Sequence, residues 1–185
     1  MTDIVYYPRR AVQDTSLPLS ARRFLLALCL HYEPQDSFTL SLSDIKRQAS
    51  VSPDTFRQAK AALLDAAYLV PAGRADCQHP CYRFQREQAL ELDRGICTRL
   101  LTSGLTSAAA AVFLYLYDRQ NAKCPEASLA EIHKHTGVSH SNLCIMLKDL
   151  SEAGLLQIER RQELSGQHFS NRYYIPGQTA EDHVI

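Results

Sequence analysis

The stretch Ser128-Leu-Ala-Glu-Ile-His-Lys-His-Thr-Gly-Val-Ser-His-Ser-Asn-Leu143 decides the fold class expected of this chain. Ser128 is a typical N-cap for a short helix whose apolar residues recur at helical spacing. Gly137 predicts a tight turn after that helix. Ser139 then predicts a second, longer helix that ends at Gly154 and buries Leu143, Met146, Leu147 and Leu150.

The same pattern occurs earlier in the chain, at an offset of 87 residues. Apolar positions match apolar positions over roughly thirty residues, as expected of an internal repeat. Ser52 aligns with Ser139, and Ala67 aligns with Gly154. In this first copy Ser43 predicts a short helix, and Ser52 followed by proline predicts the start of a longer one over 52–66. Its buried residues are expected to be Phe56, Ala59 and Leu63.

Further elements flank each copy in the same order. Ser20 and Ser107 are expected to cap a preceding apolar helix in each copy. Short strands are expected at 38–40, 68–70, 82–84, 155–159 and 172–175. The segment 86–101 is expected to be a helical connector or an oligomerisation element. The N-terminal residues Tyr6, Tyr7, Arg9 and Arg10 suit either a DNA-contacting arm or a strand packed on the first unit.

The composition is that of an ordinary globular protein, with 45% hydrophobic residues and 20 Lys+Arg against 20 Asp+Glu in 185 residues. Zero net charge excludes a histone-like protein that holds nucleic acid by bulk positive charge. Six cysteines without a signal peptide predict free thiols in the cytoplasm. The longest apolar stretch is too short to cross a membrane. Motifs of common enzymes are absent, so neither catalysis nor a cofactor is expected.

The order helix, strand, helix, turn, helix and two-stranded wing resembles the winged helix-turn-helix family, and the Gly137-Val-Ser139 turn is similar to that of its bacterial members. The resemblance covers about 17–176. It implies a mainly α (α+β) fold with small β wings: a unit at 1–85 with its N-terminal arm, a connector at 86–104, a second unit at 105–176 and a flexible tail at 177–185. Each unit is expected to have its own core.

The same resemblance implies binding of double-stranded DNA by a transcription regulator of a bacterial, phage or plasmid system, as a monomer or a homodimer. One alternative is a plasmid or phage replication initiator that binds repeated origin sites. Another is a tandem winged helix that binds proteins instead of DNA, as in the accessory subunits of bacterial condensins.

The recognition helices are expected at 52–66 and 139–153, and helices of this kind read bases with their N-terminal, outward residues. Arg57 suits guanine, and Gln58 and Asn142 suit adenine, whereas Asp54 would repel a phosphate. Ile145 is expected outside, against a thymine methyl group or a protein. The full set of candidate DNA contacts is Ser52, Thr55, Arg57, Gln58, Lys60, Arg74, Arg83, Ser139, His140, Ser141, Asn142, Lys148, Arg160, Arg161 and Arg172, with His79 and His168 as further wing residues.

The Cys and His clusters of the sequence do not predict a metal site. Cys77-x-His79-x-Cys81 could hold a metal or sense oxidants, but its spacing is not that of a zinc finger, and ordinary wing residues are expected. His133 and His135 are two positions apart on a helix and therefore point in different directions. Solvated or DNA-facing histidines are expected, and no metal site is predicted. Buried, core positions are expected for Cys29, Cys144, Phe24, Phe56, Phe113 and Tyr117.

Overall fold

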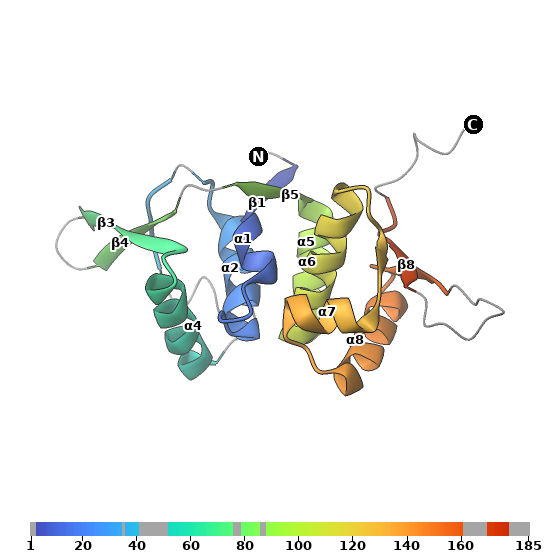
Figure 1. Cartoon of the computed structure of the whole chain (residues 1–185). Helices are drawn as coiled ribbons and strands as arrows, with labels where there is room; N and C mark the ends of the chain where they lie inside the picture. The colour runs from blue at the N-terminus through green and yellow to red at the C-terminus, as the bar shows by residue number, and fades with distance from the viewer. Residues whose placement is uncertain are drawn as a thin grey trace.

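A computed structural model describes residues 3–34, 36–40, 52–75, 79–85, 88–160 and 170–177, with the side chains of 74, 75 and 79 excepted. The described chain is a mixed α/β fold with small antiparallel sheets (Figure 1). Its helices are α1 (Arg9–Gln13), α2 (Leu19–His31), α4 (Pro53–Asp65), α5 (Arg94–Thr102), α6 (Ser107–Asn121), α7 (Leu129–Thr136) and α8 (His140–Glu152). Its strands are β1 (Ile4–Pro8), β2 (Phe38–Thr39), β3 (Leu69–Ala75), β4 (His79–Phe84), β5 (Ala89–Asp93), β6 (Glu126–Ala127), β7 (Gln157–Glu159) and β8 (Asn171–Tyr174).

The element pattern repeats along the chain. The bounds of α8 follow those of α4 at the offset of 87 residues that the sequence predicts. Two three-stranded sheets have matching orders, β2-β4-β3 in the first half and β6-β8-β7 in the second. The strand at 38–40 and both later strand pairs are therefore confirmed, although β3 and β4 extend further into the expected loop. The short helix expected after Ser43 lies outside the described residues.

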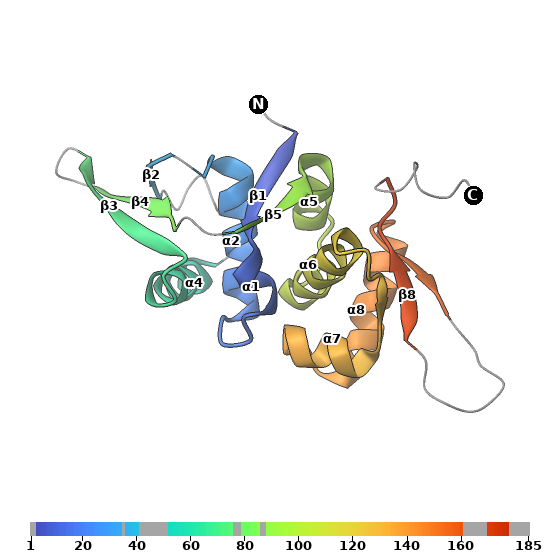
Figure 2. The same cartoon turned by 45° about the horizontal axis from the view of Figure 1, so that its top comes forward.

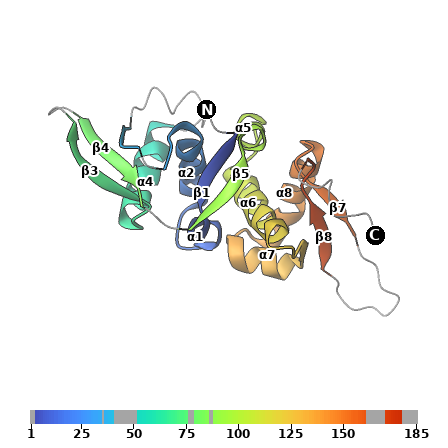
Figure 3. The same cartoon turned by 90° about the horizontal axis from the view of Figure 1, so that it is seen from above.

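The two halves lie side by side through their central helices. In Figure 1, α2 and α6 occupy the middle, with α4 and the β3–β4 hairpin at one end and α8 with β8 at the other. Figure 3 shows the same order from above. Both α4 and α8 begin at the lower edge of Figure 1, so their N-terminal ends face the same side of the molecule.

A single hydrophobic core runs through both halves, which corrects the expectation of two separate cores. The reason is that α2 and α6 are apolar around most of their circumference, so each packs on the other as well as on its own half. Phe24 of α2 and Phe113 of α6 are fully buried. Phe24 also contacts Phe56 of α4 edge to face, with ring centroids 5.4 Å apart. The core positions expected for the four aromatic residues are confirmed.

The connector is not helical throughout. Its first part forms β5, which pairs antiparallel with β1 at registers such as Tyr7↔Leu90 (Figure 2). Leu90 and Leu92 are buried while their neighbours are exposed, which is the two-residue period of a strand. Only 94–102 is helical. Tyr6 and Tyr7 thus lie in a packed strand, as one of the two interpretations expected, whereas Arg9 and Arg10 begin α1.

The helix caps agree with the sequence in part. Ser52 and Ser128 cap α4 and α7, and Ser128 forms a reciprocal capping box with Glu131. The cap of α6 is Thr106 instead of Ser107, and α2 begins after Pro18 instead of at Ser20. Threonine offers the same hydroxyl acceptor, and proline suits a helix start because its φ is already helical. Within the described residues, no helix is long and apolar enough to cross a bilayer.

Candidate nucleic-acid interface

The first turn of α8 carries the most coherent group of predicted contacts. His140, Ser141 and Asn142 are exposed, while Leu143 on the opposite side is buried in the core. Ser139 occupies the N-cap position but makes no capping hydrogen bond; its Oγ lies 3.2 Å from the Oγ of Ser141. The first amides of α8 therefore lack a side-chain acceptor, and such amides bind anions readily.

The first turn of α4 is organised differently. Ser52 Oγ accepts a hydrogen bond from the Thr55 amide at 3.1 Å and lies 2.9 Å from Thr55 Oγ1, so both hydroxyls are engaged within the helix. Arg57 and Gln58 are exposed, and Arg57 forms an ion pair with Asp54 three residues earlier. Exposed pairs of this kind contribute only about 0–1 kcal/mol, so Arg57 is available to another anion at little cost.

Two lysines predicted as contacts also have partners. The Lys60 ammonium lies 4.8 Å from the centre of the Tyr82 ring, which directs it toward the β3–β4 hairpin. The Lys148 ammonium lies 3.6 Å from a carboxylate oxygen of Glu152 one turn later on α8. The ion pairs of Lys148 and Arg57 with carboxylates leave little net charge on the exposed faces of α4 and α8.

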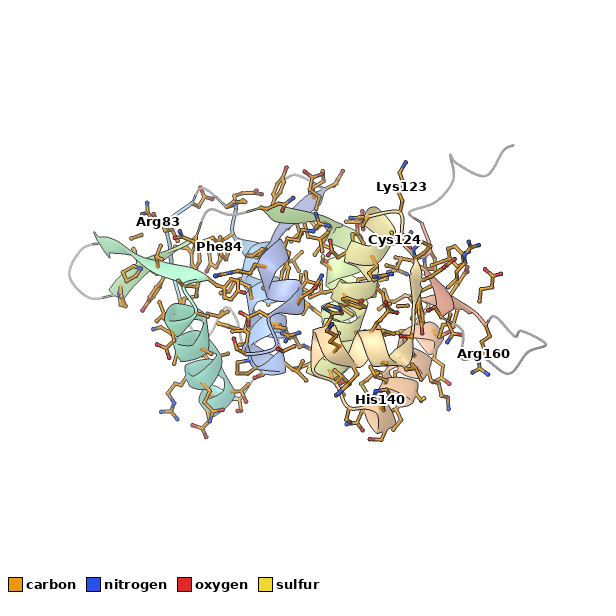
Figure 4. The ribbon with its side chains drawn as sticks, viewed as in Figure 1. Arg83, Phe84, Lys123, Cys124, His140 and Arg160 are labelled. Atoms are coloured by element: carbon orange, nitrogen blue, oxygen red, sulfur yellow. The ribbon has the colours of Figure 1, made fainter. Side chains whose placement is uncertain are left out.

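The described hairpin arginines do not gather at the N-terminal turns of α4 and α8. Tyr82 of β4 is buried and the adjacent Arg83 is exposed, because neighbouring strand residues point to opposite faces. Figure 4 shows Arg83 on the side of the hairpin away from the start of α4, and Arg160 exposed beyond the end of β7. The side chain of Arg74 is not among those described, and Arg161 and His168 lie outside the described residues.

The Arg172 side chain binds a glutamate on the neighbouring strand of its sheet. Its Nε donates to Glu126 Oε1 at 3.0 Å, and these two residues face each other in the β6–β8 register. Hydrogen bonding with Glu126, and then with Tyr174, raises the pKa of the Arg172 guanidinium. The structure therefore gives Arg172 a partner within the protein that the sequence did not suggest.

A groove lies between α8 and the strands β7 and β8. It has a volume of about 480 Å³ and is lined by Cys144, Leu147, Lys148, Arg160 and Asn171, among others. Cys144 is exposed here, so its expected core position is wrong; Cys29 is buried as expected. Ile145 is 52% exposed, which confirms that it points outward.

A second, open cleft of about 700 Å³ lies between the two halves, and the sequence did not predict it. Arg9, Arg10, Gln88 and Asp118 line it, and Arg9 Nε lies 2.8 Å from the buried Asp118 carboxylate. Arg10 stacks over the Tyr68 ring, 4.4 Å from its centre, and donates to the Ala66 carbonyl. The cleft carries balanced charge and does not adjoin the start of α4 or α8.

The histidines separate as the sequence predicts. The His135 ring stacks on Tyr115, with centroids 5.4 Å apart, while His133 points to the turn before α8. There the His133 ring meets that of His140, at a centroid distance of 4.9 Å that the sequence did not indicate. Of the other expected ligands, Cys77 lies outside the described residues and Cys81 is buried. Within the described residues, no group of three His, Cys, Asp or Glu side chains is arranged to hold a metal.

The predicted contacts thus form one continuous group on α8, a smaller group on α4, and scattered arginines on the hairpins. The chain was also compared with known proteins. No model of a protein family matches this sequence, and no curated protein is significantly similar to it.

Proposed function

We propose that this chain is a tandem winged-helix protein that binds double-stranded DNA through the N-terminal turns of α4 and α8, as a transcription regulator of a bacterial, phage or plasmid system. The observation that supports this most directly is the equivalence of the two helices. They have the same length at an offset of 87 residues, and both begin on the same side of the molecule.

A recognition helix needs a buried side that anchors it and a polar N-terminal side that reaches the bases. Both helices have these two sides. Phe56, Ala59 and Leu63 anchor α4, and Arg57 and Gln58 are exposed beside them. On α8, the polar candidate is Asn142, which aligns with Thr55 of α4 at the offset of 87 residues. An asparagine that pairs with adenine contributes about 1–3 kcal/mol of discrimination.

The continuous core between the halves gives this proposal a geometric consequence. Because α2 and α6 are packed together, α4 and α8 are held at one fixed separation and orientation. One chain would therefore contact two half-sites with a defined spacing, without needing a second copy. The near-neutral helix faces favour base contacts over bulk phosphate attraction, so a modest salt dependence is expected, with a slope of about −0.9 for each phosphate contacted.

Selection of bound duplexes from a random library, followed by footprinting, tests the proposal. Arg57→Ala with Gln58→Ala should erase protection at one half-site, and Asn142→Ala should weaken it at the other by tenfold or more. Arg99→Ala and Asn121→Ala remove the same side-chain types from exposed positions on α5 and α6, so they serve as matched controls. Failure to enrich any duplex, even at low salt, would overturn DNA binding.

A protein-interaction module is the second candidate, and it is favoured by Ile145. This residue is one of two large hydrophobic side chains that are exposed in the described part of the chain, and it lies on α8 between Asn142 and Lys148. If duplex selection fails while Ile145→Ser abolishes concentration-dependent association in sedimentation experiments, α8 serves a protein interface instead. Replication initiation would use the same DNA contacts at repeated origin sites, and it would also require recruitment of replication proteins.

A further inference from the structure

The turn between α7 and α8 brings together two imidazole rings from different helices. His133 lies in the last turn of α7 and His140 is the first residue of α8. Their ring centroids are 4.9 Å apart at an interplanar angle of 54°, and both residues are exposed. The αL conformation of Gly137, with φ of 76°, reverses the chain between them and makes the approach possible.

A backbone carbonyl sets the tautomer of the neutral His133 ring. Its Nδ1 lies 2.9 Å from the Val138 carbonyl oxygen, which can only accept a hydrogen bond, so Nδ1 carries the proton. The Nε2 lone pair of the neutral ring is then free. Histidines that bind metals characteristically donate their other N–H to a carbonyl or carboxylate in this way, because the bond fixes the tautomer and the ring orientation.

From this geometry we propose that His133 and His140 form a two-ligand site for a divalent transition-metal ion, with Zn²⁺ as the probe. Two imidazole nitrogens bound to one tetrahedral zinc lie about 3.4 Å apart, since each Zn–N bond is about 2.0–2.1 Å long. Centroids 4.9 Å apart leave facing ring atoms within about that distance of each other, and rotation of the exposed His140 ring turns one of its nitrogens toward Nε2 of His133. The remaining positions are open to water or to a phosphate oxygen.

The electrostatic surroundings define how strong such a site is. The negative end of the α7 dipole favours a cation at His133, while the positive end of the α8 dipole and the neighbouring Lys134 oppose one. The helix-dipole contributions oppose each other and are only about 0.3–1 kcal/mol each, so the affinity depends mainly on the two nitrogen bonds. A bound ion would therefore exchange readily with solvent, and it would link the end of α7 to the start of α8. This inference does not depend on DNA binding.

The test uses the full chain with Cys77, Cys124 and Cys144 replaced by serine, because thiols also bind zinc. Titration calorimetry with ZnCl₂ should detect one ion per chain. His140→Ala should weaken binding at least tenfold while leaving the bond between His133 and Val138 intact. His133→Ala should weaken binding to the same extent, although it also removes that bond. His135→Ala removes the histidine stacked on Tyr115 and serves as the matched control, with unchanged affinity expected.

A second measurement separates coordination from misfolding. In ¹H–¹⁵N spectra of the imidazoles, zinc should shift Nε2 of His133 and a ring nitrogen of His140, while the Nδ1 proton of His133 stays protected. Zinc binding that is unchanged in both alanine variants, or that disappears in the serine background, would overturn the site. Loss of affinity in the His135→Ala control to the same extent would overturn it as well.

Discussion

Ala67 and Gly154 end equivalent helices in the same left-handed conformation, with φ of 57° and 66°. In both cases the next amide closes the helix end: Tyr68 N–H donates to the Leu63 carbonyl at 2.9 Å, and Leu155 N–H donates to the Leu150 carbonyl at 3.0 Å. The two helix ends thus share one backbone conformation although their residue types differ. An alanine in this conformation is strained because its Cβ approaches the following carbonyl oxygen.

Exchanging the residues at these two positions should shift stability in opposite directions. Ala67→Gly relieves the strain but makes the unfolded chain more flexible, so a gain of about 0.5 kcal/mol in the free energy of unfolding is expected. Gly154→Ala should lose about 1 kcal/mol. An added Cβ at Gly154 meets no atom within 4 Å, so this loss reflects the backbone conformation alone. Urea unfolding measures both changes, and equal signs would contradict the interpretation.

Arg23 joins the first half to the segment that leads into the second. It is 8% exposed, and its guanidinium donates to the carbonyls of Leu101, at 3.0 Å, and of Leu105. Burial lowers the pKa of Arg23. Arg23→Met keeps much of the volume but leaves both carbonyls without this donor, so the free energy of unfolding should fall by about 2 kcal/mol. The exposed Arg99→Met should change it by less than about 0.5 kcal/mol. Equal effects would show that the two hydrogen bonds do not stabilise the fold.

The described cysteines should differ sharply in reactivity. Burial raises the pKa of Cys97 to about 12 and that of Cys29 well above its usual value, so both stay protonated and covered. Cys124 and Cys144 are exposed. Iodoacetamide at pH 8 followed by peptide mass spectrometry should label these two in the native chain, and should label Cys29 and Cys97 only after unfolding. Labelling of Cys97 at the rate of Cys144 in the native chain would contradict this.

The capping box of α7 should make part of the stability depend on pH. Hydrogen bonding from the Ser128 amide outweighs burial and lowers the pKa of Glu131 below its ordinary value of 4.5. A carboxyl group with a lowered pKa in the folded state contributes stability above its unfolded pKa, and this contribution is lost as the pH falls through the folded value. Stability should therefore decrease below about pH 4.5.

Glu131→Gln separates charge from hydrogen bonding in this box. Glutamine can still accept from Ser128 but cannot titrate, so the decline in melting temperature between pH 5 and pH 3 should become shallower. Glu91→Gln, at an exposed strand position, serves as the control and should leave the slope unchanged. A steeper decline in Glu131→Gln than in the unaltered chain would refute the assignment.

Local chemistry alone determined the helices at 53–65, 129–136 and 140–152, the turn at Gly137 and the internal repeat. Capping hydroxyls, a turn glycine and helical spacing of apolar residues act within a few positions, so they can be recognised without tertiary information. The outward position of Ile145 follows from the same periodicity.

Only the tertiary structure decided that one core joins the halves, that β5 replaces the first part of the expected connector, and that Cys144 is exposed. These features depend on which distant segment packs against a given face: β1 against β5, α2 against α6, and the strands β7 and β8 beside α8. The pairing of Arg172 with Glu126 and the approach of His133 to His140 are of the same kind. Side-chain partners across elements are fixed by packing in three dimensions, which the periodicity of a single element does not contain.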